Sequence, residues 1–372
     1  MLSAVTVPDS HCGPVKTPGI VRRHPELRWL ASVLLIVAGT AAVVTSVNGT
    51  FRDDPSLPAT SPEQLVAKVR VPHVAGYSGT FVTHIAMSLP TTMLNALTDA
   101  VPVGGSLLHG SHTVRYWYGG IDRQRAAVVG LSDEQDVFRN GSDLLLWDTR
   151  THTAQRSTLA DTDSATLPLS VATPAALTPP QLAGRILELA GDDTDTTLRS
   201  GGLVADRQTY ELVIHPDAAE SRIAEIDIQI DGLQLVPLGV QIIARGTDPS
   251  RPAVDVSFNS ITFAQPAAQN FAFTPPHDAT LSTGAPLGQL SGLVDKLRLV
   301  GSSWLSTASL TTTPAAAKLL VYALGKQPAR VHGTWGSGRL LQTKMICVLV
   351  TDAGRVVAGA VDPSVLYRAV GG

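Results

Sequence analysis

The sequence has few cysteines and few charged residues for a chain of 372 residues. Its two cysteines, Cys12 and Cys347, cannot make the disulfide framework of a small secreted domain. Charged residues make up 16% and hydrophobic residues 44%, which excludes both a disordered tail and a polytopic membrane protein. The net charge of -3 offers no basic patch, so we expect no nucleic-acid partner.

Motifs of the common enzyme classes are also missing. The chain has no zinc-protease histidine pair, no nucleophile elbow, no phosphate loop and no dinucleotide fingerprint. His109 and His112 lie three residues apart, and on a strand this spacing points them to opposite faces, which is poor geometry for a metal. The acidic run Gly191–Asp195 lacks the remaining spacing of a calcium loop. We therefore expect a protein that is not an enzyme and has no metal or other cofactor.

One long hydrophobic run is present near the N-terminus. Residues 29–47 contain no charged side chain, and as a helix they would be about 28 Å long, enough to cross a bilayer core. Arginines precede the run and aspartates follow it: Arg22, Arg23, Arg28, Asp53 and Asp54. The positive-inside rule then places residues 1–28 in the cytoplasm and everything after the run, including the linker 48–60, outside. The sequence predicts a single-pass plasma-membrane protein with an extracytoplasmic C-terminal part.

A cleaved signal peptide is the alternative interpretation of this run. The run and the segment before it are long for a signal peptide, and Thr45-Ser46-Val47 is only a weak cleavage site. Both interpretations send the rest of the chain to the same compartment. Cys12 follows polar residues and does not look like a lipidated cysteine, and in the anchored topology it cannot reach Cys347.

Beyond the linker, helix signals alternate with strand signals. Ser61 and Pro62 predict a helix over 61–71, and Thr178 followed by two prolines predicts a second over 179–190. Elsewhere the hydrophobic period is two, which is typical of strands, and Asn140-Gly141 is a strong hairpin signal. The predicted strands cover 113–118, 123–129, 134–139, 143–148, 209–215, 223–230, 237–245 and 254–263.

The composition of the sequence changes after Pro275-Pro276. We interpret residues 278–372 as a small α+β region with a helix that begins at Pro314. A hairpin should follow, with strands over 340–350 and 355–361. Cys347 lies in the apolar run of the first strand, where we expect a buried, unreactive thiol.

Isoleucines and polar residues alternate along 226–230, which predicts a sheet with one apolar and one solvated face. A set of turn and strand motifs lies within residues 61–277: Gly79–Val82, Gly110–Gly120, Arg123–Arg125, Asp136–Gly141, Leu146–Asp148, Val256–Phe263 and Asn270–Pro276. In these motifs the segment resembles the LolA-like lipoprotein-carrier superfamily, in the membrane-tethered form of high-GC Gram-positive bacteria. The superfamily includes sensors of the RseB/MucB type and mycobacterial lipid carriers.

This resemblance implies an α+β fold: an unclosed antiparallel β half-barrel with helices in its concave face. It also implies that acyl chains of lipids or lipoproteins bind between sheet and helices. A sensor acting on a partner membrane protein and a structural scaffold are the alternatives. The chain departs from the superfamily in lacking a lipidated cysteine and in adding residues 278–372.

From the period-two pattern we predict that a ligand cavity is lined by one face of the sheet. The alternative is that these positions are ordinary core, fully covered by the helices 62–71 and 179–190. The candidate residues are Phe81, Ile85, Tyr116, Tyr118, Ile226, Ile228, Ile230, Val256 and Phe258.

Overall fold

The alternating apolar and polar residues form one large sheet. The structure is a computed structural model, and it describes residues 57–69, 74–100, 105–158, 178–190, 194–283, 298–325 and 328–371. The strands of the large sheet are β1 (Tyr77–Ile85), β2 (Gly110–Tyr118), β3 (Arg123–Val129), β4 (Glu134–Asn140), β5 (Asp143–Asp148), β6 (Thr153–Thr158), β7 (Asp195–Val204), β8 (Arg207–His215), β9 (Ile223–Asp231), β10 (Pro237–Ala244), β11 (Val254–Thr262) and β12 (Thr280–Thr283).

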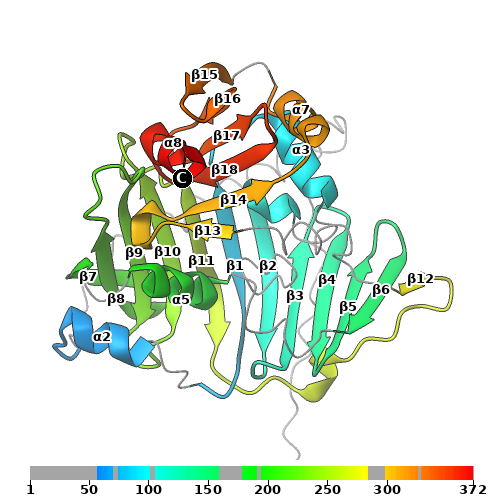
Figure 1. Cartoon of the computed structure of the whole chain (residues 1–372). Helices are drawn as coiled ribbons and strands as arrows, with labels where there is room; N and C mark the ends of the chain where they lie inside the picture. The colour runs from blue at the N-terminus through cyan, green and yellow to red at the C-terminus, as the bar shows by residue number, and fades with distance from the viewer. Residues whose placement is uncertain are drawn as a thin grey trace, which may run out of the picture. The chain divides into compact units, whose positions relative to one another are not determined.

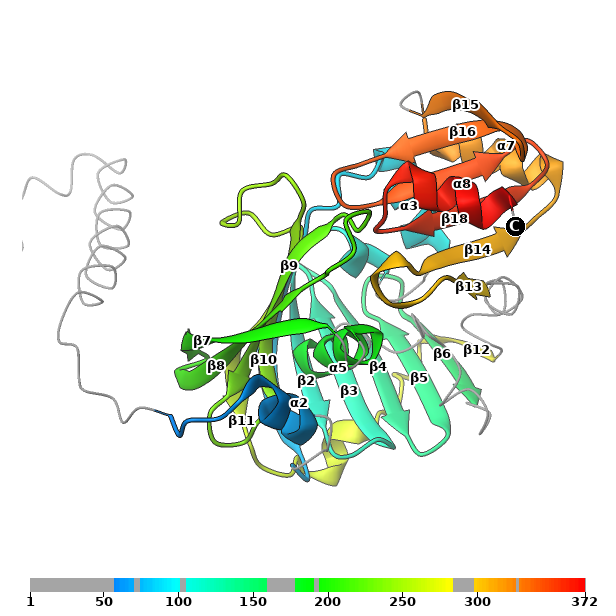
Figure 2. The same cartoon turned by 60° about the vertical axis from the view of Figure 1, so that its left-hand side comes forward.

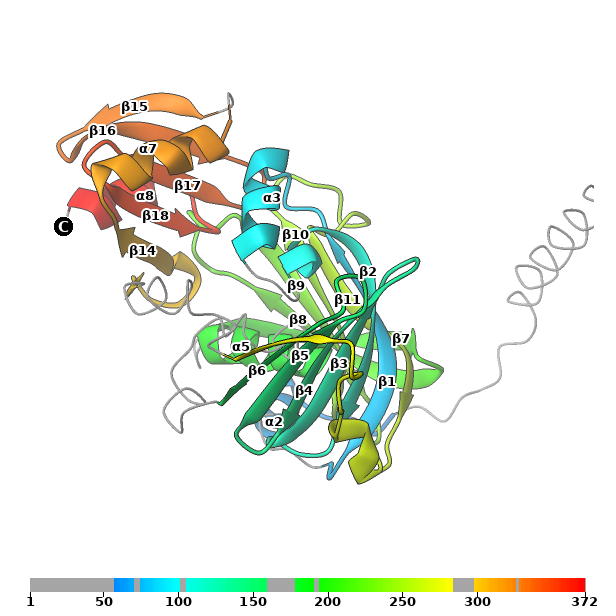
Figure 3. The same ribbon diagram turned by 90° about the vertical axis from the view of Figure 1, so that its right-hand side faces the viewer.

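Two antiparallel meanders make up this sheet and meet at β1 and β11 (Figure 1). The order is β12-β6-β5-β4-β3-β2-β1-β11-β10-β9-β8-β7, and β12 pairs with β6 in parallel. The edge strands β12 and β7 do not pair with each other in the described part of the chain, so the sheet is unclosed. Figure 3 shows how strongly it curves. The predicted class, a mostly-sheet α+β protein with an unclosed sheet, is confirmed.

Short helices lie against the inner side of the curved sheet (Figure 2). The first is α2 (Pro62–Val69), where the Ser61 Oγ accepts a hydrogen bond from the Gln64 N–H at 3.3 Å. The second, α5 (Pro179–Ala190), has the predicted bounds. Helix α3 (Thr91–Ala100) and the 3-10 turn η2 (Gly105–Leu108) follow β1 and are not predicted by the sequence analysis. A further 3-10 turn, η4 (Ala268–Phe271), follows β11.

The C-terminal region forms a second, six-stranded sheet in the order β13-β14-β18-β17-β16-β15. Helices cover both of its faces: Ala317 of α7 packs against Val348, while Leu366 of α8 packs near Leu349. Double coverage explains why every residue of β17 is buried. The elements are β13 (Arg298–Val300), η5 (Ser303–Leu305), β14 (Thr307–Thr311), α7 (Pro314–Ala323), β15 (Ala329–Gly333), β16 (Gly336–Gln342), β17 (Cys347–Thr351), β18 (Arg355–Gly359) and α8 (Pro363–Gly371).

One predicted strand in this region is wrong. The apolar run 340–350 is not continuous, because β16 ends at Gln342 and β17 begins at Cys347. Thr343 closes a turn between them: its N–H donates to the Ile346 carbonyl at 2.9 Å, and its hydroxyl accepts from the Ile346 N–H at 2.9 Å. Cys347 itself is fully buried as expected, and burial raises the pKa of its thiol.

The predicted membrane run 29–47 and its flanking segments lie outside the described residues. Within the described ranges, no helix combines the length and the apolar character that spanning a bilayer requires. The boundary at 277/278 stays a prediction, although β12 at Thr280–Thr283 still pairs with the large sheet. Residues 57–372 form one compact unit.

Two side chains of the C-terminal region belong to the core of the large sheet. Trp304 of η5 is 4% exposed and Met345 is 8% exposed, and both lie in the hydrophobic cluster formed by the large sheet and α5. The C-terminal region therefore helps to close the core of the half-barrel as well as its own.

We expect Trp304→Ala to lower the free energy of unfolding by about 3–5 kcal/mol, because it removes a large buried side chain from a closed core. Leu233→Ala is the control at a position that is 78% exposed, and it should change stability by less than about 0.5 kcal/mol. Urea unfolding of both variants measures the difference. Equal, small effects would contradict the assignment of Trp304 to this core.

Candidate functional site

The nine predicted cavity residues come together on the inner face of the large sheet. They lie on strands β1, β2, β9 and β11, and with β10 and β8 these strands form the centre of one hydrophobic cluster. Tyr118 packs against the edge of the cluster, and the other eight are buried members of it. On each of these four strands, the residues predicted to line a cavity are therefore those whose side chains face the inner side of the sheet.

Strand register explains how residues so far apart in the sequence meet. Phe81 lies opposite Phe258 on one neighbouring strand and opposite Val114 on the other. The rings of Phe81 and Phe258 are 5.6 Å apart in an edge-to-face arrangement, a favoured geometry for aromatic pairs. Ile228 lies between Val240 of β10 and Leu212 of β8, and all three are fully buried.

This face is closed. Eight of the nine residues are at most 6% exposed, so their side chains are almost completely covered. Tyr118 is only half-buried and stacks on Tyr77 with the ring centroids 5.1 Å apart. In this conformation the inner face is a filled core, and a ligand can reach it only after something moves.

Helix α5 is the part of the cover that touches the sheet most closely. Its buried residues Ala183, Ile186, Leu187 and Ala190 follow helical spacing and face β10 and β11. Two of these four are alanines, so the large side chains that the helix packs on the cluster are Ile186, Leu187 and the partly buried Leu182. Gly184 adds no side chain, and there is open space where its Cβ would be.

The sequence analysis missed several members of this face. Val114, Leu212 and Val240 have the same parity as the predicted residues, and a complete period-two count would have found them. Trp304 and Met345 could not be found that way, because only the tertiary fold brings them to the cluster.

Some polar atoms inside this apolar layer have a hydrogen-bond partner, and others have none among the described residues. The Tyr116 hydroxyl donates to the Gln124 Oε1 at 3.1 Å, and burial raises its pKa well above the ordinary value, so it stays neutral. The Thr83 hydroxyl and the Trp304 indole nitrogen are buried and have no hydrogen-bond partner among the described residues. Each such group costs about 1–3 kcal/mol.

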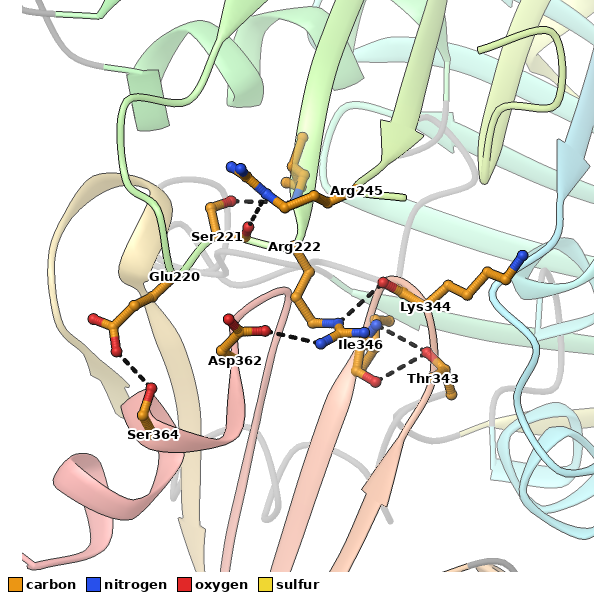
Figure 4. Close-up of polar contacts among 10 residues, drawn as sticks. Glu220, Ser221, Arg222, Arg245, Thr343, Lys344, Ile346, Asp362 and Ser364 are labelled. Carbon is orange, nitrogen blue, oxygen red and sulfur yellow. Dashed lines mark hydrogen bonds and ion pairs between the residues drawn. The ribbon is translucent and has the colours of Figure 1, made fainter. Parts of the chain in front are cut away.

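A polar latch joins the C-terminal region to the loop before β9 (Figure 4). The Arg222 guanidinium donates to the Asp362 carboxylate at 2.8 Å and to the Lys344 carbonyl at 3.0 Å. Glu220 accepts from Ser364 and binds both terminal nitrogens of Arg368, at 2.9 and 2.6 Å. These hydrogen bonds and ion pairs hold the region that brings Trp304 and Met345 to the core.

The opposite face of the same strands is polar and acidic. Asp227 is 5% exposed, and burial, followed by the negative charge of Glu225, raises its pKa to about 7. The pKa of Asp255 is raised as well, mainly by burial. Arg199 donates to Glu225 at 2.7 Å, and its nitrogen lies 3.7 Å from the Asp227 Oδ1.

Among the described residues, no group of three or more His, Cys, Asp and Glu is arranged to hold a metal. The His112 ring bonds to the His109 carbonyl at 2.8 Å, so this pair is linked through the backbone.

No protein-family model and no curated protein matches this chain. Several solved structures are similar to it. The MucA/MucB complex of Pseudomonas aeruginosa matches with 15% identity over 83% of this chain and 95% of that chain, with a TM-score of 0.43. A LolA superfamily protein from Nitrosomonas europaea matches with 10% identity over 58% of this chain and 99% of that chain, with a TM-score of 0.24.

A conserved protein from Thermus thermophilus matches with 8% identity over 60% of this chain and 98% of that chain, with a TM-score of 0.34. The chain is thus similar to structures named for MucB and for the LolA superfamily, the group to which its sequence motifs relate it, with TM-scores below 0.5 in each case.

The raised pKa of Asp227 predicts a pH-dependent effect on stability. Between about pH 4 and pH 7 the unfolded chain ionises this carboxyl while the folded protein still holds its proton, so stability is lost as the pH rises. Asp227→Asn should therefore raise the melting temperature more at about pH 8 than at about pH 5. Asp143→Asn, at an exposed position on β5, is the control and should show no such difference. A uniform effect of Asp227→Asn at both pH values would be the contrary result.

Proposed function

We propose that this chain is a cell-envelope protein that binds the acyl chains of lipids or lipoproteins on the inner face of its large sheet. The observation that supports this most is the continuous apolar face itself, which spans β1, β2 and β8–β11 under a cover of short helices. The face binds no chain in the closed conformation. Acyl chains enter when α5 moves away and take the place of its side chains.

The energies of opening and binding are of similar size. Exposing Ile186 and Leu187 costs about 1.5–3 kcal/mol each, and the alanines of α5 add little. A bound acyl chain gains about 0.8 kcal/mol for each methylene group that it buries. A chain with about ten buried methylenes therefore offsets the loss of the α5 contacts.

We further propose that residues 29–47 anchor the protein in the plasma membrane, with residues 48–372 outside the cytoplasm. The uncharged run with arginines before it and aspartates after it supports this topology. A tethered domain takes up lipid at the membrane surface and does not diffuse away with it.

A sensor that passes a signal to a partner membrane protein is the second candidate. The polar latch favours it, because the ion pairs of Arg222 and Glu220, together with backbone hydrogen bonds between the same segments, couple the C-terminal region to the loop before β9. A ligand that displaces Trp304 would then change the position of the C-terminal region relative to the large sheet. A stable complex with a membrane partner, released by lipid, distinguishes the sensor from a carrier.

Acyl-chain binding is tested with a variant that weakens the packing of α5 on the large sheet. Leu187→Ala should increase the affinity for a fluorescent fatty acid, by about tenfold for each 1.4 kcal/mol removed from the cost of opening α5. Leu349→Ala is the matched control, since Leu349 is equally buried but lies in the core of the six-stranded sheet. It should destabilise the protein without changing affinity.

Lower affinity in Leu187→Ala would contradict entry beneath α5. Equal changes in both variants would attribute the effect to general destabilisation. Failure of the unmodified protein to bind the probe would refute acyl-chain binding itself.

The topology predicts where a reporter is active. A reporter fused after Gly372 should work only when it requires the extracytoplasmic compartment, and the protein should remain in membranes after carbonate washing. Cytoplasmic activity contradicts the orientation. Recovery in the soluble fraction with a new N-terminus near residue 48 identifies a cleaved signal peptide.

A further inference from the structure

A cleft of about 480 Å³ lies on the polar face of the large sheet, opposite the apolar layer. Its floor includes Glu211 of β8, Gln229 of β9, Gln241 of β10 and Ser257 of β11. These residues alternate with the buried residues Leu212, Ile228, Val240 and Val256, so they point to the other side of the sheet. The cleft also reaches Phe258 of β11, a residue of the proposed acyl-chain site, so the two sites adjoin each other there.

The end of β7 forms one wall of this cleft. The pairing of β7 with β8 is interrupted between Ser200 and Leu203, and Gly201 fits there because a Cβ would lie 2.1 Å from the Thr209 carbonyl oxygen. The Thr209 hydroxyl donates to the Gly202 carbonyl at 2.9 Å and fixes the bulge. Leu203 and Val204 then line the cleft with aliphatic groups, and Leu203 is 65% exposed.

The floor of the cleft carries one carboxylate among several side-chain amides and a hydroxyl group. Gln229 lies over Gly239, where its Oε1 is 2.3 Å from the place of a Cβ, so the glycine leaves room for this amide. The Gln241 amide already donates to the Asp255 Oδ2 at 3.1 Å. Glu211 adds a carboxylate to the floor.

A buried carboxyl group next to the floor has one oxygen without a hydrogen bond from the described residues. Asp227 pairs with Gln241 across the strands and is two residues from Gln229, so it faces the same side. It is 5% exposed, and its Oδ1 accepts no hydrogen bond from the described residues; its nearest cation is Arg199 at 3.7 Å. The Asp255 Oδ1, on the other side of Gln241, is also buried without a hydrogen bond from them. Such a surface favours a ligand that only donates.

We infer that this cleft binds an aliphatic ammonium group, from a free alkyl amine or from a lysine side chain. An ammonium has three donors and no acceptor, so it can donate to the Glu211 carboxylate and to the amide oxygens of the floor. Its positive charge is complementary to Glu211 and to the acidic residues beside the cleft, and its methylene chain packs on Leu203 and Val204. Arg199 already shows that these carboxylates hold a cation.

The test is calorimetric titration of the whole chain with diaminopentane, with Nα-acetyl-lysine amide, whose side-chain ammonium is free, and with pentanediol. Both amines should bind, and the diol should not, because it has the same carbon chain but no charge. Tighter binding of diaminopentane identifies a free amine as the natural source, and tighter binding of the lysine derivative identifies a peptide.

Glu211→Gln should weaken amine binding by about tenfold, the factor for one charge-assisted hydrogen bond. Leu203→Ala should weaken amine binding by less than tenfold, because the substitution removes only an apolar contact. For the same reason the salt dependence of amine binding should stay unchanged. Asp143→Asn, far along the sheet on β5, should leave binding unchanged. The inference would be overturned if the diol bound as well as the amines or if neither amine bound. It would also be overturned if neither Glu211→Gln nor Leu203→Ala changed amine binding.

Discussion

The pairing of β1 with β11 is the interaction on which the rest of this structure depends. It joins residues 77–85 to residues 254–262 and so turns two separate meanders into one sheet. Only this pairing places Phe81 beside Phe258 and makes the apolar sides of both meanders continuous. Neither meander alone presents a face of this width, so the core and the proposed acyl-chain site both follow from one long-range contact.

A continuous apolar face must be covered, and here the cover comes from three distant parts of the chain. Helix α2 contributes Leu65, α5 contributes two alanines and the larger Leu182, Ile186 and Leu187, and the C-terminal region contributes Trp304 and Met345. The sheet is stable because its strands share many hydrogen bonds, whereas the cover is held by few contacts. Local opening therefore starts at the cover, and the Trp304 indole nitrogen, which is buried without a hydrogen-bond partner among the described residues, adds to its tendency to open.

Much of this architecture could be predicted from the sequence, because strand periodicity and helix capping are local signals. The parity of Ile226, Ile228 and Ile230 placed them correctly, and the two prolines after Thr178 marked the start of α5. Strand β7 was missed because its Gly201-Gly202 bulge interrupts the alternation. The turn at Thr343 was missed because apolar residues flank it on both sides.

The closure of the site could not be predicted, since it depends on tertiary contacts. Nothing in the local sequence of Trp304 indicates that it lies in the core of another sheet, and the latch between Arg222 and Asp362 joins residues far apart in the chain. The cleft on the polar face has the same origin: its floor comes from four strands, and its wall exists only because β7 bends at the bulge.

Photo-crosslinking with a diazirine-labelled fatty acid tests acyl-chain binding at the inner face most directly. Peptide mapping should find the label on α5 and on β9 to β11, and an excess of unlabelled fatty acid should remove it. Label confined to exposed apolar residues such as Leu319 and Tyr322 of α7, or label that does not saturate, would contradict the account.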